Sequence, residues 1–263
     1  MDTELKDKTV LITGGSSGIG KGIALVLAEE GMHLAIASRN PDLDAIEEIR
    51  AKGVRCVRIT ADVSQEADVG RMVAEVIDKL GHLDCYVNNA AWAWHQPITK
   101  IDTDSWRKTL DTNLSSCVWA CREVCRHMIA RGSGSIVIIS STSRFTPSYC
   151  ETAYRISKEG LHIYMQNLAI EMAPYGVRVN MVTPGHFKTR LTGDAPPAIE
   201  DKMRQIIPAH RFGEPKEVGY AVAFLLSDRL SGYTYGADLL VDGGLSISPL
   251  PLLSEQDVRR LNL

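Results

Sequence analysis

Short runs of apolar and β-branched residues alternate along the chain with longer segments in which apolar residues recur every three or four positions. Runs of the first kind predict buried strands, and segments of the second kind predict amphipathic helices. Strands are expected over 8–13, 33–38, 54–60, 83–87, 135–139, 177–182 and 239–241. Helices are expected between them, one ending near Gly31 and others over 42–52, 65–80, 105–130, 151–173, 198–207 and 216–226.

Strands that alternate with helices at this pace predict an α/β protein with a doubly wound sheet of seven parallel strands and helices on both faces. No linker rich in Pro, Ser or Gly, no internal repeat and no low-complexity tract interrupts the pattern, so residues 1–263 are interpreted as a single domain. Ligands of such sheets gather at the carboxyl ends of the strands. Gly14, Arg39, Asp62 and Asn88 all follow predicted strands and are therefore candidates for a binding site.

The composition excludes several classes of function. Hydrophobic residues make up 44% of the chain and charged residues 23%, as in globular rather than disordered proteins. The net charge of −3 and the lack of a dense Lys/Arg run argue against nucleic acid and anionic membranes as partners. The N-terminus has no signal-peptide pattern, and no apolar run approaches the roughly 18 residues that span a bilayer. A cytoplasmic protein without a membrane partner is expected.

Cys117, Cys121 and Cys125 recur every four residues within the predicted helix 105–130. Such a stripe suggests a metal site, but no His or carboxylate completes a tetrahedral set at suitable spacing. A buried or interfacial face of small apolar side chains is the favoured interpretation, and no metal is predicted. Because the chain shows no secretory signal, disulfides among the six cysteines are not expected.

A glycine-rich turn, Gly-Gly-Ser-Ser-Gly-Ile-Gly over 14–20, separates the first strand from the first helix. Strand, glycine-rich turn and helix in this order are what a dinucleotide site requires. The glycines permit a tight turn and close approach of the backbone to a pyrophosphate, and the helix N-terminus offers free N–H groups and its dipole. Nucleotide binding is therefore predicted.

Ser38 and Arg39 follow the second strand, at the position that selects between nicotinamide cofactors. An acidic residue there would bind the ribose 2′-hydroxyl of NAD, whereas an Arg pairs with the 2′-phosphate of NADP. NADP is therefore predicted, with NAD as the alternative; an exposed loop Arg is the other interpretation of Arg39. After the third strand, Asp62 and Val63 are placed to bracket the adenine, although Asp62 serves equally well as a cap for the helix 65–80.

Tyr154 and Lys158 stand four residues apart in the predicted helix 151–173, which places them on one face, one turn apart. A cation at that distance stabilises a phenolate and lowers the pKa of the Tyr toward working pH, which suits a proton-transfer group. Asn113 is a poor residue for the middle of the helix 105–130. It indicates a local irregularity, a buried polar role or a surface position.

Taken in order, these motifs resemble those of the short-chain dehydrogenase/reductase family, in its compact single-domain branch, over residues 6–244. The matching pieces are Thr13 with the 14–20 turn, Asn88-Asn89-Ala90, Asn113, Ser141, Tyr154-Arg155-Ile156-Ser157-Lys158, Pro184-Gly185 and Val241-Asp242-Gly243-Gly244. The resemblance implies a Rossmann-type fold and a homotetramer or homodimer. Within the family the chain is most similar to sugar or polyol dehydrogenases and 3-oxoacyl-carrier-protein reductases.

The resemblance also implies chemical roles. Tyr154 would be the general acid in carbonyl reduction and the base in alcohol oxidation, and Lys158 would hold the nicotinamide ribose and lower the pKa of Tyr154. Ser141 would hydrogen-bond the substrate oxygen, with its neighbour Ser140 as the alternative. Asn113 would anchor a water that links Lys158 to solvent.

The same resemblance places a larger set of residues against the cofactor, in addition to the four at the ends of the second and third strands. This set is Gly14, Ser16, Ser17, Ile19, Asn88, Asn89, Ala90, Tyr154, Lys158, Pro184, Gly185 and Thr189. The chain departs from the family where Ala91 replaces a glycine, which would crowd the turn near the nicotinamide without abolishing binding. The tail, 245–263, runs past the family's usual end, and we expect it to pack on a neighbouring subunit or to cover the substrate pocket.

Mixed aromatic and polar side chains flank the predicted catalytic set, and the segment 186–211 is the predicted substrate lid. The flanking residues are Trp92, Trp94, His95, Ser143, Arg144, Tyr149, Glu151, His186 and Phe187. This mixture indicates a small polar sugar, polyol or keto compound as substrate. For the two histidines, a hydrogen-bonded position at the rim is favoured over a second acid/base role.

The prediction is an NADP(H)-dependent oxidoreductase that interconverts a carbonyl and a secondary alcohol by hydride transfer, with Tyr154 as acid/base. An enzyme like the 3-oxoacyl-carrier-protein reductases is one alternative. A catalytically silent nucleotide-binding regulatory protein is the alternative from another class. The joint presence of Tyr154, Lys158 and Ser141 argues against that silent protein.

Overall fold

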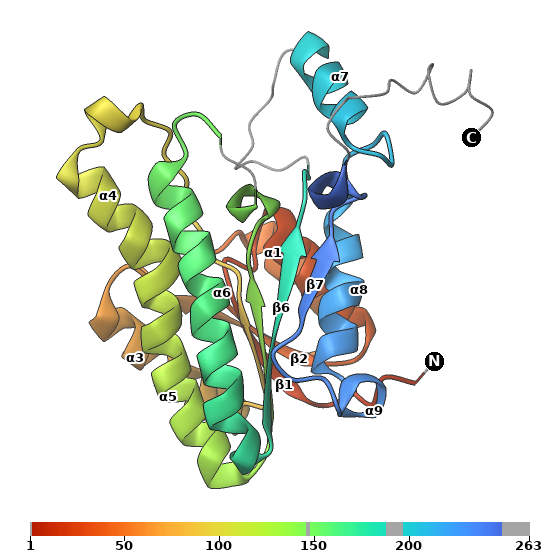
Figure 1. Cartoon of the computed structure of the whole chain (residues 1–263). Helices are drawn as coiled ribbons and strands as arrows, with labels where there is room; N and C mark the ends of the chain where they lie inside the picture. The colour runs from red at the N-terminus through yellow and green to blue at the C-terminus, as the bar shows by residue number, and fades with distance from the viewer. Residues whose placement is uncertain (1, 146–147, 188–196, 249–263) are drawn as a thin grey trace.

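Seven parallel strands form the central sheet, in the order β3-β2-β1-β4-β5-β6-β7 (Figure 1). This computed structural model describes residues 2–145, 148–187 and 197–248. The strands are β1 (Thr9–Thr13), β2 (His33–Ser38), β3 (Cys56–Thr60), β4 (Cys85–Asn88), β5 (Gly134–Ile139), β6 (Val177–Pro184) and β7 (Asp238–Val241). The predicted α/β class and every predicted strand are confirmed, although β3 begins two residues later than expected.

Helices cover both faces of this sheet (Figure 1). One face carries α3 (Glu66–Leu80), α5 (Ser116–Arg131) and α6 (Thr152–Met172), and the other carries α1 (Gly18–Glu29), α2 (Leu43–Arg50) and α8 (Pro215–Leu226). Further helices are α4 (Thr103–Leu110), α7 (Pro197–Ile206) and α9 (Asp228–Ser231). Across the described part of the chain, none of these helices has the length and apolar character that crossing a membrane requires.

Alternate side chains of each strand point to opposite faces, which divides the core in two. On β1, Leu11 packs in the core beneath α3, α5 and α6, while Val10 and Ile12 pack in the core beneath α1, α2 and α8. Every residue of β1 is buried. Coverage on both faces explains why the strands appear in the sequence as continuous apolar runs rather than as alternating ones.

The order of the strands reverses between β1 and β4, because β2 lies on one side of β1 and β4 on the other. Doubly wound sheets bind their ligands at such a reversal, beyond the carboxyl ends of the two strands. Gly14 follows β1 and Asn89 follows β4. The topology therefore brings two of the predicted binding motifs to one place.

The helix predicted over 105–130 is interrupted. α4 ends at Leu110, a π-helical turn covers Asp111–Ser115, and α5 begins at Ser116. Asn113 lies in this turn and is completely buried. Such turns insert one extra residue into a helix and are frequent at functional sites. A local irregularity and a buried polar role for Asn113 are both confirmed, and a surface position is wrong.

The cysteine stripe of α5 faces the interior. Cys117, Cys121 and Cys125 are all buried, and the sulfur atoms of the first two are 3.9 Å apart. They belong to the core beneath α3, α5 and α6. The interpretation as a buried face of small apolar side chains is therefore confirmed.

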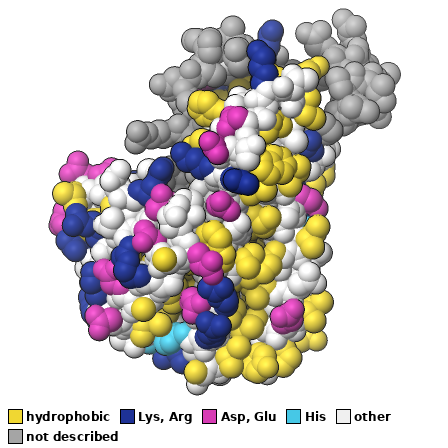
Figure 2. All heavy atoms as spheres, turned by 90° about the vertical axis from the view of Figure 1, so that its left-hand side faces the viewer, with side chains coloured by type: hydrophobic (Ala, Val, Ile, Leu, Met, Phe, Trp, Pro, Cys, Tyr) yellow, Lys and Arg dark blue, Asp and Glu magenta, His cyan; other side chains and the backbone are white. Residues whose placement is uncertain are grey.

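Apolar side chains remain exposed on the outer face of α6. Ile156, Ile163 and Ile170 are 47%, 54% and 74% exposed, and their spacing of seven residues places them in one stripe. In the view of Figure 2, hydrophobic side chains gather in a band beside a surface rich in charged ones. At the edge of the sheet, Leu239 and Leu240 of β7 are also exposed. The molecule thus has two apolar surfaces that its own described elements do not cover.

Candidate active site

The end of β4 holds the glycine-rich turn between β1 and α1. Asn89 donates from Nδ2 to the carbonyl oxygens of Thr13 (2.9 Å) and Gly14 (3.2 Å). The Thr13 hydroxyl accepts the N–H groups of Asn89 (3.0 Å) and Ala90 (3.1 Å). Gly14 has a φ of +66°, and a Cβ at Gly20 would lie 2.2 Å from the Gly14 carbonyl oxygen. The turn therefore closes only where these positions lack a side chain.

The start of α1 fits an anion such as a pyrophosphate. Ser17 is the N-cap residue, but its side chain does not cap the helix. The first N–H groups of α1 are therefore left for another acceptor, and the helix dipole favours a negatively charged one. Gly14, Ser16 and Ile19 lie in the same turn, with Ser16 buried. The glycine-rich turn and the start of α1 fit the phosphates of a dinucleotide. The contacts of individual residues with these phosphates stay predictions.

Two polar side chains at the end of β2 have no partner in the described part of the chain. The Ser38 hydroxyl is buried without a hydrogen bond, and the Arg39 side chain is exposed without an ion pair. Both stand beside the glycine-rich turn, because the N–H of Gly14 donates to the carbonyl of Ala37 (2.7 Å). A hydroxyl and a guanidinium are suitable donors for a phosphate group.

Asp62 and Val63 follow β3, and the side chains of both contact neighbouring parts of the protein. The Oδ1 of Asp62 accepts the N–H (3.0 Å) and the hydroxyl (2.8 Å) of Ser64. Val63 packs in the core beneath α3. Asp62 thus shapes the turn into α3, whose N-cap is Gln65 rather than Asp62. Contact of either residue with an adenine stays a prediction.

Ser141 follows the carboxyl end of β5, close enough to Tyr154 for its hydroxyl to oppose the rise in the pKa of the phenol. Ser141 also accepts the N–H of Ser143 (3.2 Å), which fixes it at the start of a short 3₁₀ turn. Ser140 is buried and donates to the carbonyl of Lys158 (3.3 Å). Of the two adjacent serines, Ser141 is the one that faces the phenol.

Lys158 lies one turn beyond Tyr154 on α6 and is 2% exposed. Its Nζ donates to the carbonyl of Ile139 at the end of β5 (2.9 Å) and stands 5.7 Å from the centre of the Tyr154 ring. The predicted spacing therefore places the ammonium and the phenol on one face of α6, beside the end of β5.

Asn113 uses its amide to join the π-helical turn to two other segments. Its Oδ1 accepts the N–H of Trp92 (2.7 Å), and its Nδ2 donates to the carbonyl of Trp92 (3.0 Å) and to the hydroxyl of Ser157 (3.0 Å). Asn113 thus links the loop after β4 to the residue that precedes Lys158. A water between Asn113 and Lys158 stays a prediction.

Burial dominates the pKa values of the predicted catalytic residues. It raises the pKa of Tyr154 to about 12, opposed by the nearby hydroxyl of Ser141 and reinforced by the negative charge of Glu151. It lowers the pKa of Lys158 to about 8, against an opposing effect of Cys117. The net shift of the Tyr154 pKa is therefore upward rather than downward, because burial of the phenol dominates, and the contribution of Lys158 stays a prediction.

Two arginines hold the loop that carries Ser141. Arg155 donates from Nε to the carbonyl of Ser143 (2.6 Å). Arg144, expected at the substrate pocket, is instead buried in ion pairs with Glu159 (3.1 Å) and Asp238. The role of Arg155 was missed because nothing in the local sequence indicates that a residue inside the Tyr-to-Lys turn reaches back to the loop after β5.

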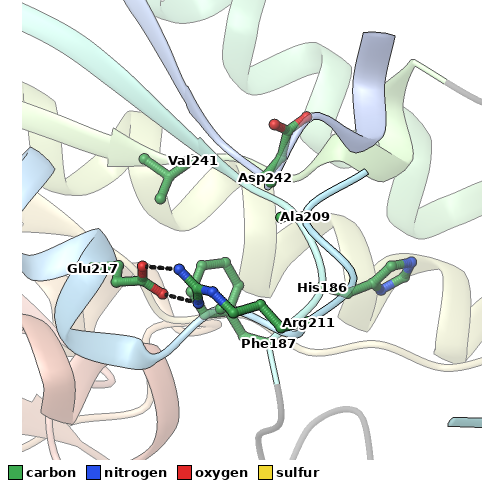
Figure 3. A pocket seen from close by; sticks show the side chains of 9 residues that line it. His186, Phe187, Ala209, Arg211, Glu217, Val241 and Asp242 are labelled. Atoms are coloured by element: carbon green, nitrogen blue, oxygen red, sulfur yellow. Dashed lines mark hydrogen bonds and ion pairs between the residues drawn. The ribbon is translucent and has the colours of Figure 1, made fainter. Parts of the chain in front are cut away.

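His186 follows β6 at a small cavity that Arg211 and Glu217 also line (Figure 3). Arg211 binds the Glu217 carboxylate through two hydrogen bonds (2.8 and 2.6 Å), and the imidazole of His186 is directed away from this pair (Figure 3). Burial lowers the pKa of His186, and the negative charge of Glu151 opposes that effect. His186 is therefore expected to be neutral at neutral pH.

Pro184 is the last residue of β6, and the N–H of Gly185 donates to the carbonyl of Val241 on β7 (2.9 Å). A Cβ at Gly185 would lie 2.7 Å from Asp242, so the glycine lets the turn pass close to β7. Thr189 and the rest of 188–196, within the predicted lid 186–211, lie outside the described residues, as does the tail beyond 248. Their predicted roles stay predictions.

The chain matches the family model described as Enoyl-(Acyl carrier protein) reductase over residues 14–246. It is 34% identical to the 3-oxoacyl-(acyl-carrier-protein) reductase FabG of Staphylococcus epidermidis over 242 residues, which cover 91% of this chain and 99% of the relative. It is 33% identical to the L-rhamnose 1-dehydrogenase (NAD(P)(+)) of Azotobacter vinelandii over 253 residues, which cover 93% and 98% of the two chains.

Solved structures agree with these relatives. A short-chain type dehydrogenase/reductase from Mycobacterium marinum superimposes with a TM-score of 0.86 at 31% identity, over 93% of this chain and 97% of the other. A gluconate 5-dehydrogenase from Burkholderia cenocepacia, in complex with NADP and tartrate, gives a TM-score of 0.88 at 31% identity, over 94% and 98%. The chain belongs to the short-chain dehydrogenase/reductase family, whose members bind NAD(P), and it is an oxidoreductase acting on CH–OH or carbonyl groups.

Proposed function

We propose that the protein is an NADP(H)-dependent enzyme that interconverts a carbonyl and a secondary alcohol, with Tyr154 as acid/base. The observation that carries this proposal is the placement of Lys158 one turn beyond Tyr154 on α6, with its Nζ 5.7 Å from the centre of the Tyr154 ring and bound to the end of β5, the strand that Ser141 follows. A proton donor and a cation on one helix face, together with a hydroxyl from a neighbouring loop that can stabilise an oxyanion, are the groups that carbonyl reduction needs.

Bound NADPH supplies the hydride, and the protein supplies the proton and the orientation. Ser141 donates to the substrate oxygen and stabilises the negative charge that develops on it. Tyr154 donates its proton to the same oxygen, and a pKa of about 12 keeps the phenol protonated and ready to act as an acid at neutral pH. Lys158, whose Nζ donates to the carbonyl of Ile139, would bind the nicotinamide ribose and attract the phenolate that remains.

Ser38 and Arg39 support a preference for NADP. The hydroxyl and the guanidinium stand beside the glycine-rich turn without partners in the described ranges, and together they would hold a 2′-phosphate. The similarity to a gluconate 5-dehydrogenase solved with NADP agrees with this preference. NAD is the alternative cofactor, and the test is the ratio of kcat/KM with NADPH and NADH.

A small polar carbonyl compound, sugar or polyol is the proposed substrate. Exposed polar and aromatic side chains at the rim, among them Trp94 and His95, support it, as does the similarity to L-rhamnose 1-dehydrogenase. The similarity to 3-oxoacyl-(acyl-carrier-protein) reductase favours a 3-oxoacyl thioester as the second candidate. A panel of sugars, hydroxy ketones, keto-esters and 3-oxoacyl thioesters, followed by NADPH absorbance, separates the two.

A homotetramer or homodimer is the proposed assembly. The isoleucine stripe of α6 and the exposed leucines of β7 are two apolar surfaces that a second copy of the chain would bury. Light scattering coupled to size-exclusion chromatography tests this, with Ile163→Lys and Leu240→Lys as variants that should each weaken one contact. The cytoplasmic location stays a prediction.

A further inference from the structure

The loop that carries Ser141 ends in a buried arginine. A 3₁₀ turn spans Thr142–Arg144 directly after Ser141, and the N–H of Arg144 donates to the carbonyl of Ser141 (3.2 Å). In the same turn, the Oγ of Ser141 accepts the N–H of Ser143 (3.2 Å). The Arg144 side chain is only 8% exposed. Because these bonds join Ser141 to Arg144 within one turn, a shift of Arg144 also shifts the Ser141 hydroxyl.

The guanidinium of Arg144 binds two carboxylates that differ in burial. It forms ion pairs with Glu159 of α6 (3.1 Å) and with Asp238, the first residue of β7. The Glu159 side chain is 47% exposed, whereas that of Asp238 is 13% exposed. Solvent and salt screen the pair with Glu159 far more than the pair with Asp238. Asp238 is therefore the partner that holds Arg144 in place.

Asp238 has further contacts that fix its position. Its Oδ1 accepts the hydroxyl of Thr183 on β6 (2.6 Å), and the Nδ1 of His162 on α6 lies 3.7 Å from its Oδ2. β6 and β7 are paired as neighbouring strands of the sheet. The ion pair between Arg144 and Asp238 thus joins the Ser141 loop to the edge of the sheet.

Arg155 holds the same turn from the side of α6. It donates from Nε to the carbonyl of Ser143 (2.6 Å) and from Nη2 to the carbonyl of Arg144 (3.4 Å). Arg155 directly follows Tyr154. The Ser141 turn is therefore held between the helix that carries Tyr154 and the strand that carries Asp238.

Stability alone does not explain the buried charge of Arg144. Its Nε is buried without a hydrogen-bond partner among the described residues, so part of the cost of removing the guanidinium from water is not offset. Buried ion pairs add little net stability compared with apolar side chains that fill the same space. A guanidinium and a carboxylate do, however, bind in a defined geometry, which fixes the position of the segments that carry them.

We propose that Arg144 is a positioning residue, whose ion pair with Asp238 keeps the Ser141 hydroxyl where it can donate to the substrate oxygen. Arg144 acts through Ser141 and contacts neither substrate nor cofactor. This inference rests on the proposed function, because it takes from there the role of Ser141 in stabilising the oxyanion. A donor misplaced by about 1 Å can cost about 10²-fold in rate, so loss of the ion pair should reduce turnover rather than binding.

Arg144→Met and Asp238→Asn remove the ion pair from either side, and Glu159→Gln is the matched control because it removes the exposed partner of the same arginine. NADPH consumption is measured with hydroxyacetone and the other compounds of the substrate panel. We expect kcat to fall by about 10- to 100-fold in Arg144→Met and about 3- to 10-fold in Asp238→Asn, with KM for the carbonyl compound and Kd for NADPH within about twofold. Arg144→Lys retains the charge and should recover part of the loss. Glu159→Gln should change kcat by less than about twofold.

A double-mutant cycle with Ser141→Ala separates positioning from general damage to the fold. Ser141→Ala alone should lower kcat by about 10²- to 10³-fold. Because Arg144 acts through Ser141, adding Arg144→Met to Ser141→Ala should cost less than about threefold more. Asp238→Asn provides the same cycle if Arg144→Met does not fold, which thermal unfolding and a fluorescence titration with NADPH establish.

The outcomes distinguish this inference from the proposed function. Equal losses from Arg144→Met or Asp238→Asn with and without the Ser141 hydroxyl would overturn the positioning role and leave the proposed function in place. An unchanged kcat in both variants would do the same. An unchanged kcat in Ser141→Ala would overturn the positioning role together with the role of Ser141. Failure of the wild-type enzyme to consume NADPH with any compound of the panel would overturn the proposed function and, with it, this inference.

Discussion

Around the glycine-rich turn, the groups that face the cofactor position are mostly backbone, and their arrangement depends on residues that have no side chain. Gly14 and Gly20 lie against each other there, and Asn89 ties the turn together. Around Tyr154, by contrast, the groups are side chains delivered by separate segments: Ser141 from the end of β5, Glu151 and Tyr154 from α6, and His95 from the loop after β4.

This contrast separates two properties of the enzyme. A site made of backbone groups binds what the whole family binds, because any side chain can vary around it without changing the N–H groups. A site made of side chains changes whenever one of them is replaced, and it therefore carries the chemistry and the choice of substrate. Substitutions on the two sides should consequently have different effects on cofactor binding and on turnover.

Tyr154→Phe should give the largest effect. It removes the proton donor and keeps the ring, so turnover should fall by about 10²- to 10⁴-fold while NADPH binding changes little. Initial rates and a fluorescence titration with NADPH measure the two quantities. Undiminished turnover would reject Tyr154 as the acid/base.

Gly20→Ala should distort the glycine-rich turn and so reduce both stability and cofactor binding. The added Cβ would meet the carbonyl oxygen of Gly14 at 2.2 Å, so the turn must shift. We expect a loss of about 1–3 kcal/mol in the free energy of unfolding, together with weaker NADPH binding. Gly70→Ala in α3 is the control, because nothing lies within 4 Å of its Cβ position, and it should stabilise the protein by about 0.5–1 kcal/mol. Similar behaviour of the two variants in thermal unfolding would contradict this account of the turn.

Arg39→Asp should change the cofactor preference without affecting the proton-transfer groups. Replacing the guanidinium by a carboxylate repels the 2′-phosphate and offers an acceptor to a ribose hydroxyl. The ratio of kcat/KM for NADPH over NADH should fall by about 10- to 100-fold. A ratio that stays the same would show that Arg39 is not the selector.

The pH dependence of alcohol oxidation should show the smallest effect. Oxidation needs the Tyr154 phenolate, and because burial raises the pKa of Tyr154 to about 12, the oxidation rate should increase with pH through the alkaline range. The charge of Glu151 contributes to this increase in pKa, so Glu151→Gln should move the pH profile of oxidation toward lower pH. A pH profile of the Glu151→Gln variant that is displaced toward higher pH would contradict this prediction.

Much of the fold follows from local signals, because strand alternation, helical periodicity and the turn glycines are properties of neighbouring residues. The helix predicted over 216–226 and the burial of the cysteine stripe are of this kind. Contacts between distant segments are different. The hydrogen bond from Arg155 to Ser143 and the approach of His95 to Glu151 depend on where side chains point once the sheet has formed, and no local pattern encodes that.

The predicted catalytic set shows the same limit. Tyr154, Lys158, Ser141 and Asn113 were all named from motif order, and the structure brings them to one region. The direction of the Tyr154 pKa shift was nevertheless wrong, because spacing along a helix does not reveal how far a phenol is removed from water.

On this account, the glycine-rich turn binds the cofactor and the residues around Tyr154 transfer the proton, so that both act together in carbonyl reduction. The most direct measurement is the initial rate of NADPH consumption by the wild-type protein with hydroxyacetone and the other ketones of the panel, with the alcohol product quantified in parallel. The account predicts consumption of one NADPH for each alcohol formed, at a higher kcat/KM than with NADH. Tight NADPH binding without any alcohol formed from sugars, hydroxy ketones, keto-esters or 3-oxoacyl thioesters would contradict it and would favour a nucleotide-binding protein without catalytic activity.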